Sequence, residues 1–161
     1  MAVELATVEI LNAATPERAA QARQLIEEYA AWLAIDLSYQ GFDEELATLP
    51  GRYAPPSGRL LLAMIGGEPA GCVGLRDLGG GICEMKRMWV RPEFMGYTIG
   101  RRLGERAIAE VRAIGYAKMR PDTGRWMTEA TTLYRLLGFR EIPAYCYNPS
   151  PEALFFELGL T

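Results

Sequence analysis

The sequence contains no histidine. Its absence excludes Ser-His-Asp and Cys-His catalysis, HExxH metalloproteases and metal centres built on imidazole ligands. Acid–base chemistry near neutral pH is therefore left to Asp, Glu, Tyr, Cys, Lys or water. Cysteine is scarce as well, because Cys72, Cys83 and Cys146 are odd in number and widely spaced. We expect reduced, mostly buried thiols that hold no zinc.

Long apolar runs and a secretory signal are also missing, so nothing in the sequence predicts a bilayer span. We therefore expect a cytoplasmic protein without a membrane partner. The chain has 161 residues, a net charge of −3 and an apolar fraction of one half. This size predicts a single domain over residues 1–161, and the charge argues against a nucleic-acid partner.

The sequence does have a local excess of basic residues. Seven arginines and lysines lie between residues 86 and 112. Acidic residues concentrate instead between residues 27 and 45, in the first helical region and the loop after it. A basic segment in an acidic protein favours a small anionic cofactor over a polymer.

Hydrophobic periodicity and turn residues predict a mixed sheet packed between helices. Thr15-Pro16-Glu17 offers a capping hydroxyl, a proline for the first helical position and an acid in the first turn. Strands are expected at 8–11, 59–65, 70–75, 82–90, 117–120, 139–142 and 153–158, and helices at 16–33, 43–48, 97–114 and 126–137. This order predicts an α+β fold with a largely antiparallel central sheet and helices on both faces.

The segment from Ile82 to Leu103 carries the most functional information. A buried strand runs through Arg91-Pro92 and a glycine-bearing turn into a basic, amphipathic helix. This order brings unpaired backbone N–H groups, a helix N-terminus and Arg101 and Arg102 to one point. Such a point favours a phosphorylated ligand.

Two motifs make the chain resemble the GNAT N-acetyltransferase superfamily. The first is Met95-Gly96-Tyr97-Thr98-Ile99-Gly100, which follows the strand at the place of the family's Gln/Arg-x-x-Gly-x-Gly/Ala pattern and shares its last residue, Gly100. The second is the run from Leu133 to Phe139, a helix that carries a tyrosine and ends in Gly-Phe. The resemblance implies a GNAT fold, acetyl-coenzyme A as co-substrate, no metal, a small-molecule amine as acceptor and a possible homodimer.

The resemblance also implies which residues hold the coenzyme. Residues 95–100 and Arg101 match the loop that grips the pyrophosphate, and backbone groups around Met88, Trp89 and Val90 match those that pair with the pantetheine arm. Two residues depart from the pattern: Met95 replaces its polar first residue and Thr98 replaces its central glycine. A glycine at position 98 would let the backbone approach phosphate more closely.

Tyr134 matches the tyrosine that in many relatives protonates the departing thiolate. The reference pKa of a phenol, about 10, is close enough to that of a thiol for productive proton transfer. The alternative is a core aromatic residue at helical spacing, and the position of Tyr134 on the helix permits both interpretations.

Glu84 is the first candidate for the general base, because it is a carboxylate in an otherwise apolar strand. The alternative is an exposed residue or an ion pair with Lys86 or an arginine. Strict alternation predicts that Glu84, Lys86 and Met88 share one face of the sheet and Cys83, Met85, Arg87 and Trp89 the other. Asp122 is the second candidate, with a helix N-cap as its alternative.

Aromatic residues from two distant segments are candidates for the acceptor pocket, with ordinary loop packing as the alternative for each. They are Tyr29, Trp32, Tyr39, Phe42 and Tyr53 from the early segment, and Tyr145 and Tyr147, with Asn148, from the late loop. We therefore expect an acetyl-coenzyme A-dependent N-acetyltransferase that acts on a small amine. The alternative is a catalytically weakened GNAT-fold protein that binds coenzyme A or another small ligand in a regulatory role.

Overall fold

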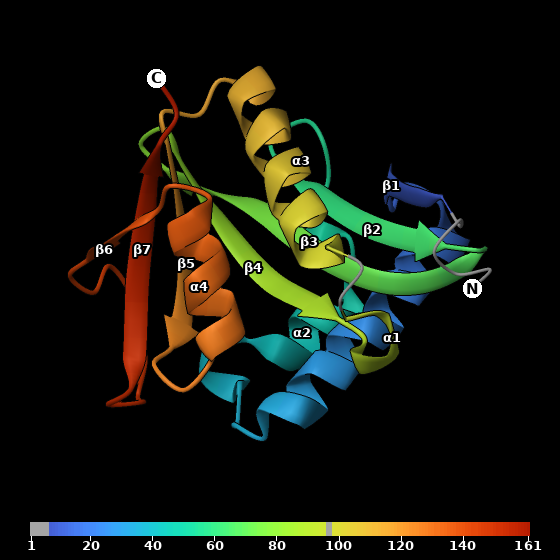
Figure 1. Ribbon diagram of the computed structural model, residues 1–161, viewed down its shortest axis with the longest axis horizontal. Coiled ribbons are helices and arrows are strands. Elements are labelled where there is room, and N and C mark those ends of the chain that lie inside the picture. Colours follow the sequence, from blue (N-terminus) through green and yellow to red (C-terminus); the bar gives the residue numbers. More distant parts are fainter. Residues whose placement is uncertain (1–6, 96–97) are drawn as a thin grey trace.

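The computed structural model describes residues 7–95 and 98–161. Seven strands form one sheet in the order β1-β2-β3-β4-β5-β7-β6 (Figure 1). The strands are β1 (Val8–Asn12), β2 (Arg59–Ile65), β3 (Glu68–Gly79), β4 (Ile82–Val90), β5 (Lys118–Gly124), β6 (Arg140–Ile142) and β7 (Ala153–Gly159). All neighbouring strands are antiparallel except β4 and β5, so the predicted α+β fold is confirmed.

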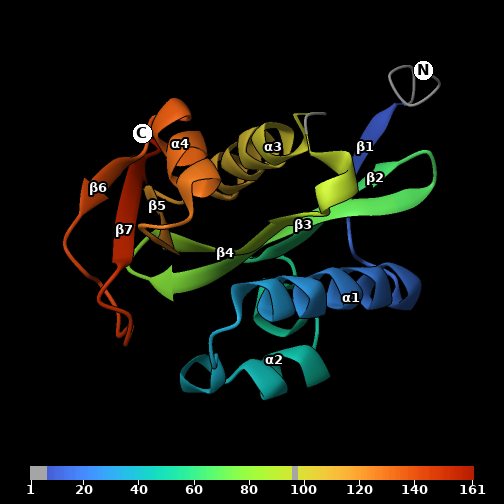
Figure 2. The same ribbon diagram turned by 60° about the horizontal axis from the view of Figure 1, so that its bottom comes forward.

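Helices cover both faces of the sheet. The α-helices are α1 (Pro16–Leu33), α2 (Phe42–Ala47), α3 (Ile99–Ile114) and α4 (Thr128–Leu136). Short 3-10 helices lie at η2 (Ser38–Gln40), η3 (Gly51–Tyr53) and η4 (Pro92–Phe94). Figure 2 shows α1 and α2 on one side of the sheet and α3 and α4 on the other.

The sequence signals explain where the long helices begin and end. The Thr15 side chain accepts a hydrogen bond from the Arg18 amide and caps α1, as predicted. The helix α3 buries a stripe that includes Leu103, Ala107 and Val111 against the sheet. It ends at Gly115, which has the positive φ (111°) that glycine adopts at little cost.

The sheet separates two hydrophobic cores. The larger lies under α3 and α4 and includes Leu61, Met85 and Phe156. The smaller lies under α1 and includes Leu25 and Trp89. The strands β2, β3 and β4 contribute side chains to both cores, whereas β5 contributes Met119 to the larger one, and this packing fixes the strands on which the site depends.

The expected pattern of faces along β4 is wrong beyond Lys86. Cys72 pairs with Trp89 and Gly74 with Lys86, so Val73 opposes two residues of β4. The extra residue is a β-bulge at Arg87, whose φ is +61°. Arg87 and Trp89 therefore point toward α1 and α2 with Lys86, whereas Met88 packs on the other side.

The strand β5 is longer than the sequence predicts. We expected it to end at Arg120, but pairing with β7 continues from Asp122 to Gly124. Pro121 lies inside the strand at the last pair with β4, Met85–Pro121, and no register pair with β7 falls on it. Asp122 is therefore a strand residue and not the N-cap of α4, which is Met127.

Candidate functional site

The strands β4 and β5 separate in the middle of the sheet. Their parallel pairing runs from Ile82–Lys118 to Met85–Pro121 and stops there. Beyond that point β4 follows β3 and β5 follows β7, and Figure 1 shows the two strands diverging toward their carboxyl ends. The β4 edge from Lys86 to Val90 is thus left without a strand partner on the β5 side, so its backbone groups can bind an extended ligand.

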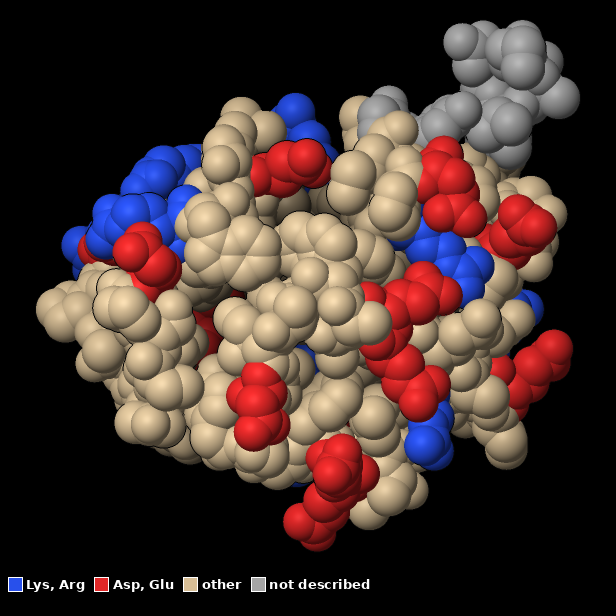
Figure 3. Space-filling model, turned by 90° about the horizontal axis from the view of Figure 1, so that it is seen from below, with Lys and Arg blue, Asp and Glu red and all other residues tan. Residues whose placement is uncertain are grey.

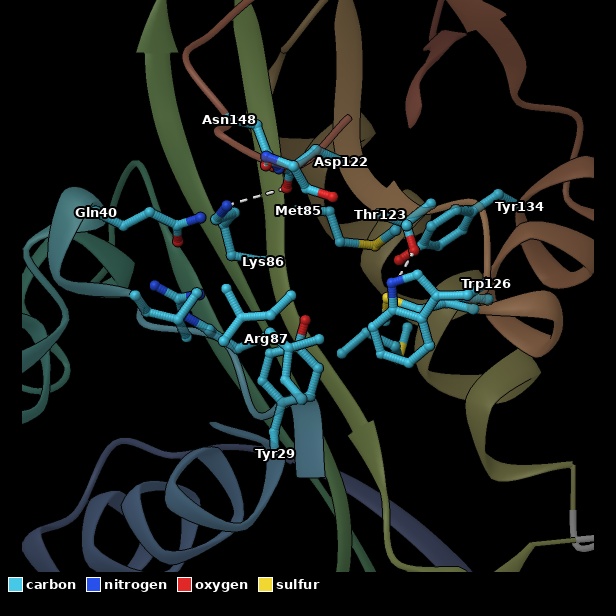
Figure 4. A pocket seen from close by; sticks show the side chains of 18 of the residues that line it. Tyr29, Gln40, Met85, Lys86, Arg87, Asp122, Thr123, Trp126, Tyr134 and Asn148 are labelled. Carbon is cyan, nitrogen blue, oxygen red and sulfur yellow. Dashed lines mark hydrogen bonds and ion pairs between the residues drawn. The ribbon is translucent and has the colours of Figure 1, made fainter. Parts of the chain in front are cut away.

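A cleft passes through the sheet at this separation. It is lined by residues of α1 and the loop after it, β4, β5, α4 and the late loop, among them Tyr29, Gln40, Lys86, Asp122, Trp126 and Tyr134. Figure 4 shows Gln40 and Arg87 on one side of the cleft and Trp126 and Tyr134 on the other. The cleft therefore connects the α3–α4 side of the sheet with the α1–α2 side.

Tyr134 reaches the cleft from α4. Its ring packs on Phe139 and Phe156, with centroid distances of 5.6 and 5.8 Å. Its hydroxyl makes no hydrogen bond with any residue that the structure describes. Burial, and secondarily the nearby Tyr29 and Asp122, raise the pKa of Tyr134, so the phenol stays protonated at neutral pH. A general acid must carry its proton at the start of the reaction, as this phenol does, although the raised pKa makes it a weaker acid than a free phenol.

Asp122 faces the cleft from β5, on the side of α1 and α2. Lys86 Nζ donates to Asp122 Oδ1 at 3.0 Å, and Asn148 Nδ2 donates to Oδ2 at 3.3 Å. The Asp122 and Lys86 side chains are 10% and 5% exposed. Each carboxylate oxygen has a second lone pair, so Asp122 can accept a further hydrogen bond from a ligand.

Glu84 lies outside the residues that line the cleft. It is buried, and Arg76 Nε and the Tyr145 hydroxyl each donate to one of its oxygens at 2.8 Å. The Tyr145 hydroxyl oxygen also lies 3.3 Å from the Arg120 carbonyl oxygen. Glu84 thus anchors the late loop that carries Asn148, and its role as the general base stays a prediction.

The start of α3 lies directly after β4 and η4. The first amides of a helix have no partner within it, and Ile99, Gly100 and Arg101 occupy this first turn. Ile99 is buried, whereas Met95, Thr98 and Arg101 are exposed. Gly96 and Tyr97, which were also predicted to bind the coenzyme, lie outside the described residues.

The predicted backbone contacts for the coenzyme arm are on the unpaired edge of β4. Met88 lines the cleft, and Trp89 and Val90 follow it. The Trp89 side chain points away to the α1 core, where its Nε1 donates to Glu28 at 3.4 Å. The indole of Trp89 therefore contributes to packing, and its backbone remains the candidate for binding.

The candidate acceptor residues divide between the cleft and the surrounding structure. Tyr29, Tyr39 and Asn148 line the cleft, as predicted for a pocket. The others do not line the cleft. The hydroxyls of Tyr53 and Tyr145 donate to Glu45 and Glu84. The rings of Phe42, Tyr147 and Trp32 contact Arg87, Tyr39 and Trp126.

Sequence reasoning missed Lys86, Gln40 and Trp126. Lysine in an apolar strand two residues after Glu84 was a usable signal, because a buried lysine needs a carboxylate partner. Gln40 and Trp126 lie in irregular segments whose direction only the folded chain defines.

Comparison with known proteins identifies the family. The model of the Acetyltransferase (GNAT) family matches residues 20–139. The chain belongs to this GNAT family. An uncharacterized N-acetyltransferase of Schizosaccharomyces pombe is 36% identical over 141 residues, which are 86% of each chain. A protein of Azospirillum brasilense named IAA acetyltransferase is 40% identical over 139 residues, 85% of this chain and 89% of that one.

Solved structures support the GNAT fold. A GNAT-family acetyltransferase from Staphylococcus aureus superposes with a TM-score of 0.80, at 19% identity over 96% of this chain and all of that chain. The structure of yncA, a putative acetyltransferase from Salmonella typhimurium with its cofactor acetyl-CoA, has a TM-score of 0.70 at 20% identity, over 97% and 94% of the two chains.

Two further findings concern the described residues. Within residues 7–95 and 98–161, no group of three or more Cys, Asp or Glu side chains is placed to hold a metal ion. No helix in the same residues is long and apolar enough to cross a membrane.

Thr98 occupies the position where the GNAT pattern has its central glycine. The backbone conformation of Thr98 shows why glycine is favoured at this position. Its φ of +60° lies in the left-handed region, which costs a residue with a Cβ about 1–2 kcal/mol. We expect Thr98→Gly to raise the melting temperature and to lower the Kd for acetyl-coenzyme A about two- to fivefold. Calorimetric titration and thermal unfolding measure both effects.

Ala34 provides the matched control, because it also has a positive φ (56°) but lies at the end of α1. Ala34→Gly should raise stability and leave the coenzyme Kd unchanged. An unchanged or weakened coenzyme affinity in Thr98→Gly would refute the steric argument.

Proposed function

We propose that this GNAT-family protein transfers an acetyl group from acetyl-coenzyme A to the amine of a small molecule, and that residues 1–161 form one acetyltransferase domain. The observation that carries the proposal is the cleft between β4 and β5. It has a protonated phenol, Tyr134, on the α4 side and a carboxylate, Asp122, on the α1–α2 side. The acetyl-CoA in the yncA structure supports the choice of donor.

The proposed chemistry is direct attack. The pyrophosphate of the coenzyme lies at the first turn of α3, and its pantetheine arm lies along the free edge of β4 from Val90 toward Met88. Backbone N–H groups near the end of β4 polarise the thioester carbonyl. The lone pair of the amine nitrogen attacks the carbonyl carbon, and the tetrahedral intermediate collapses with cleavage of the C–S bond.

Two protons move in this reaction. The attacking nitrogen loses one to Asp122, directly or through a water molecule, and the departing thiolate receives one from Tyr134. The phenolate of Tyr134 then recovers a proton from solvent. The placement of the two groups on opposite sides of the sheet suits this order, because the amine approaches the carbonyl carbon from one side and the thiolate departs on the other.

The function is tested with two measurements on the same protein. Calorimetric titration with acetyl-coenzyme A should detect binding, and a panel of primary amines should release free thiol when added. Binding without thiol release would replace this proposal with the alternative of a regulatory binder. No binding would refute both.

The choice of base is tested by a pair of isosteric variants. Asp122→Asn removes the carboxylate that faces the cleft, and we expect kcat to fall about 100-fold. Glu84→Gln retains a carbonyl oxygen for Tyr145, and we expect kcat to fall less than about fivefold. The reverse ranking, with a loss of the pH dependence of kcat in Glu84→Gln, would make Glu84 the base.

A further inference from the structure

We infer that the acceptor is a primary amine with an apolar body and without a carboxylate. This inference rests on the proposed function, because it concerns the half of the cleft from which the amine would approach. Three features of that half carry it: an apolar wall, cations that are already paired, and polar acceptors that match an ammonium group.

The apolar wall comes from the end of α1 and the loop after it. Its side chains are Tyr29, Leu33, Ile35, Leu37 and Tyr39. Ile35 remains 37% exposed at the cleft in spite of its apolar side chain. An apolar body packed there would remove this surface from water, at about 25 cal/mol per Å².

Trp126 forms the opposite wall. Its indole lies against Gly124 of β5 so closely that a Cβ on that glycine would be 2.6 Å from Nε1. Its ring is 5.4 Å from Trp32, which is 5.3 Å from Trp89 of β4. The three tryptophans thus bridge the gap where β4 and β5 no longer pair. Trp126, which lines the cleft, is nevertheless 46% exposed, so part of its ring is available to a ligand.

No cation that lines the cleft is left to bind an acceptor carboxylate. Lys86 is paired with Asp122 at 3.0 Å and Arg87 with Glu45 at 2.8 Å, and no other basic residue lines it in the described chain. A carboxylate in the acceptor would have to displace one of these buried partners, which leaves a buried charge unpaired.

The charge of the surrounding layer also opposes an anionic acceptor. Residues 16–47, which include α1 and α2, contain seven acidic and two basic residues, so their net charge is −5. Glu28 and Glu45 are paired with Arg91 and Arg87, so the other charges of this segment sum to −3. Figure 3 shows uncharged side chains in the middle of the face seen from below, acidic side chains beneath them, acidic and basic side chains to the right and basic ones at the upper left. This field attracts an ammonium group and repels a carboxylate.

The polar acceptors Gln40 and Asp122 line the same cleft as the apolar wall. Gln40 Nε2 donates to the Tyr39 hydroxyl at 2.8 Å, and Gln40 Oε1 is buried without a hydrogen-bond partner among the described residues. With Asp122 it can accept the N–H groups of an ammonium ion or amine. An amine bound there has its body directed along the apolar wall.

The test compares three amines at saturating acetyl-coenzyme A, with release of free thiol as the readout. 2-Phenylethylamine has the apolar body, ethylamine lacks it, and phenylalanine adds a carboxylate. We expect kcat/KM for 2-phenylethylamine to exceed the values for both other amines at least about tenfold. Equal values for ethylamine or for phenylalanine would overturn the inference.

Exposed residues allow variants that should fold. Trp126→Ala should lower the ratio of kcat/KM for 2-phenylethylamine over ethylamine at least about fivefold. Leu136→Ala is the control, because Leu136 is 61% exposed on α4 and does not line the cleft. It should keep the parent ratio. An unchanged ratio in Trp126→Ala would overturn the inference.

The outcomes separate this inference from the proposed function. Thiol release that is indifferent to the apolar body contradicts the inference and leaves the acetyltransferase function intact. Coenzyme binding without thiol release from any amine contradicts the function, and the inference falls with it.

Discussion

Replacement of Tyr134 with phenylalanine is expected to lower kcat about 100-fold, the effect typical of removing a general acid. The coenzyme Kd should change less than about twofold, because the ring and its packing on Phe139 and Phe156 are retained. Stability should also be unchanged, because the lost hydroxyl leaves no hydrogen-bond partner unsatisfied among the described residues. Steady-state kinetics, calorimetric titration and thermal unfolding measure the three quantities.

Tyr29 offers the control for this variant. It lines the same cleft from α1, and burial raises its pKa to about 12. Tyr29→Phe removes an equivalent hydroxyl from the opposite side of the cleft, where no thiol departs, and we expect kcat to fall less than about threefold. Equal turnover in Tyr134→Phe and the parent would remove the acid role from Tyr134.

Replacement of Glu45 with alanine is expected to destabilise the protein by about 3–5 kcal/mol. Glu45 accepts two hydrogen bonds from Arg87, at 2.8 and 2.9 Å, and one from Tyr53 at 2.9 Å. The Arg87 side chain is 2% exposed, so removal of the carboxylate leaves a buried guanidinium without its counter-charge. Urea unfolding measures the loss.

The neighbouring Glu44 is the matched control, because it belongs to the same helix and is exposed. Glu44→Ala should change stability by less than about 0.5 kcal/mol. The double variant Glu45→Leu with Arg87→Met removes both charges. Its loss of stability should be smaller than the sum of the losses measured for Glu45→Leu and Arg87→Met separately. Additive losses would show that the two residues act independently.

The same ion pair predicts a dependence of stability on pH. Burial alone would raise the pKa of Glu45, but the hydrogen bonds and charge of Arg87 outweigh it and hold the pKa below its usual value of 4.5. A lowered folded-state pKa contributes stability above the unfolded-state value, and this stability is lost as the pH falls through the folded-state value. When the pH is lowered below about 5, the free energy of unfolding of the parent should therefore fall more than that of Glu45→Gln.

Local signals in the sequence were sufficient for most of the elements. The helix α1 was predicted from its cap at Thr15, and β2 and β4 were predicted with the bounds that the structure shows. These features depend on residues close in sequence, such as a capping hydroxyl, an apolar run or a glycine at a turn. The α+β fold follows from their order.

The arrangement of the site required the tertiary structure. The bulge at Arg87 exchanges the faces of Met88 and Trp89, and no residue in β4 marks it, because arginine rarely adopts a positive φ. The carboxylate at the cleft is Asp122 and not Glu84, because β5 continues through Pro121 while β4 has turned away.

The sequence by itself determined the absence of histidine chemistry, the family resemblance and the candidate residues Tyr134, Glu84 and Asp122. Tertiary structure alone decided which carboxylate meets the cleft, which cations are already paired and which apolar side chains remain exposed. The physical reason is that partnership and burial depend on residues far apart in sequence, as Lys86 with Asp122 and Trp32 with Trp126 demonstrate.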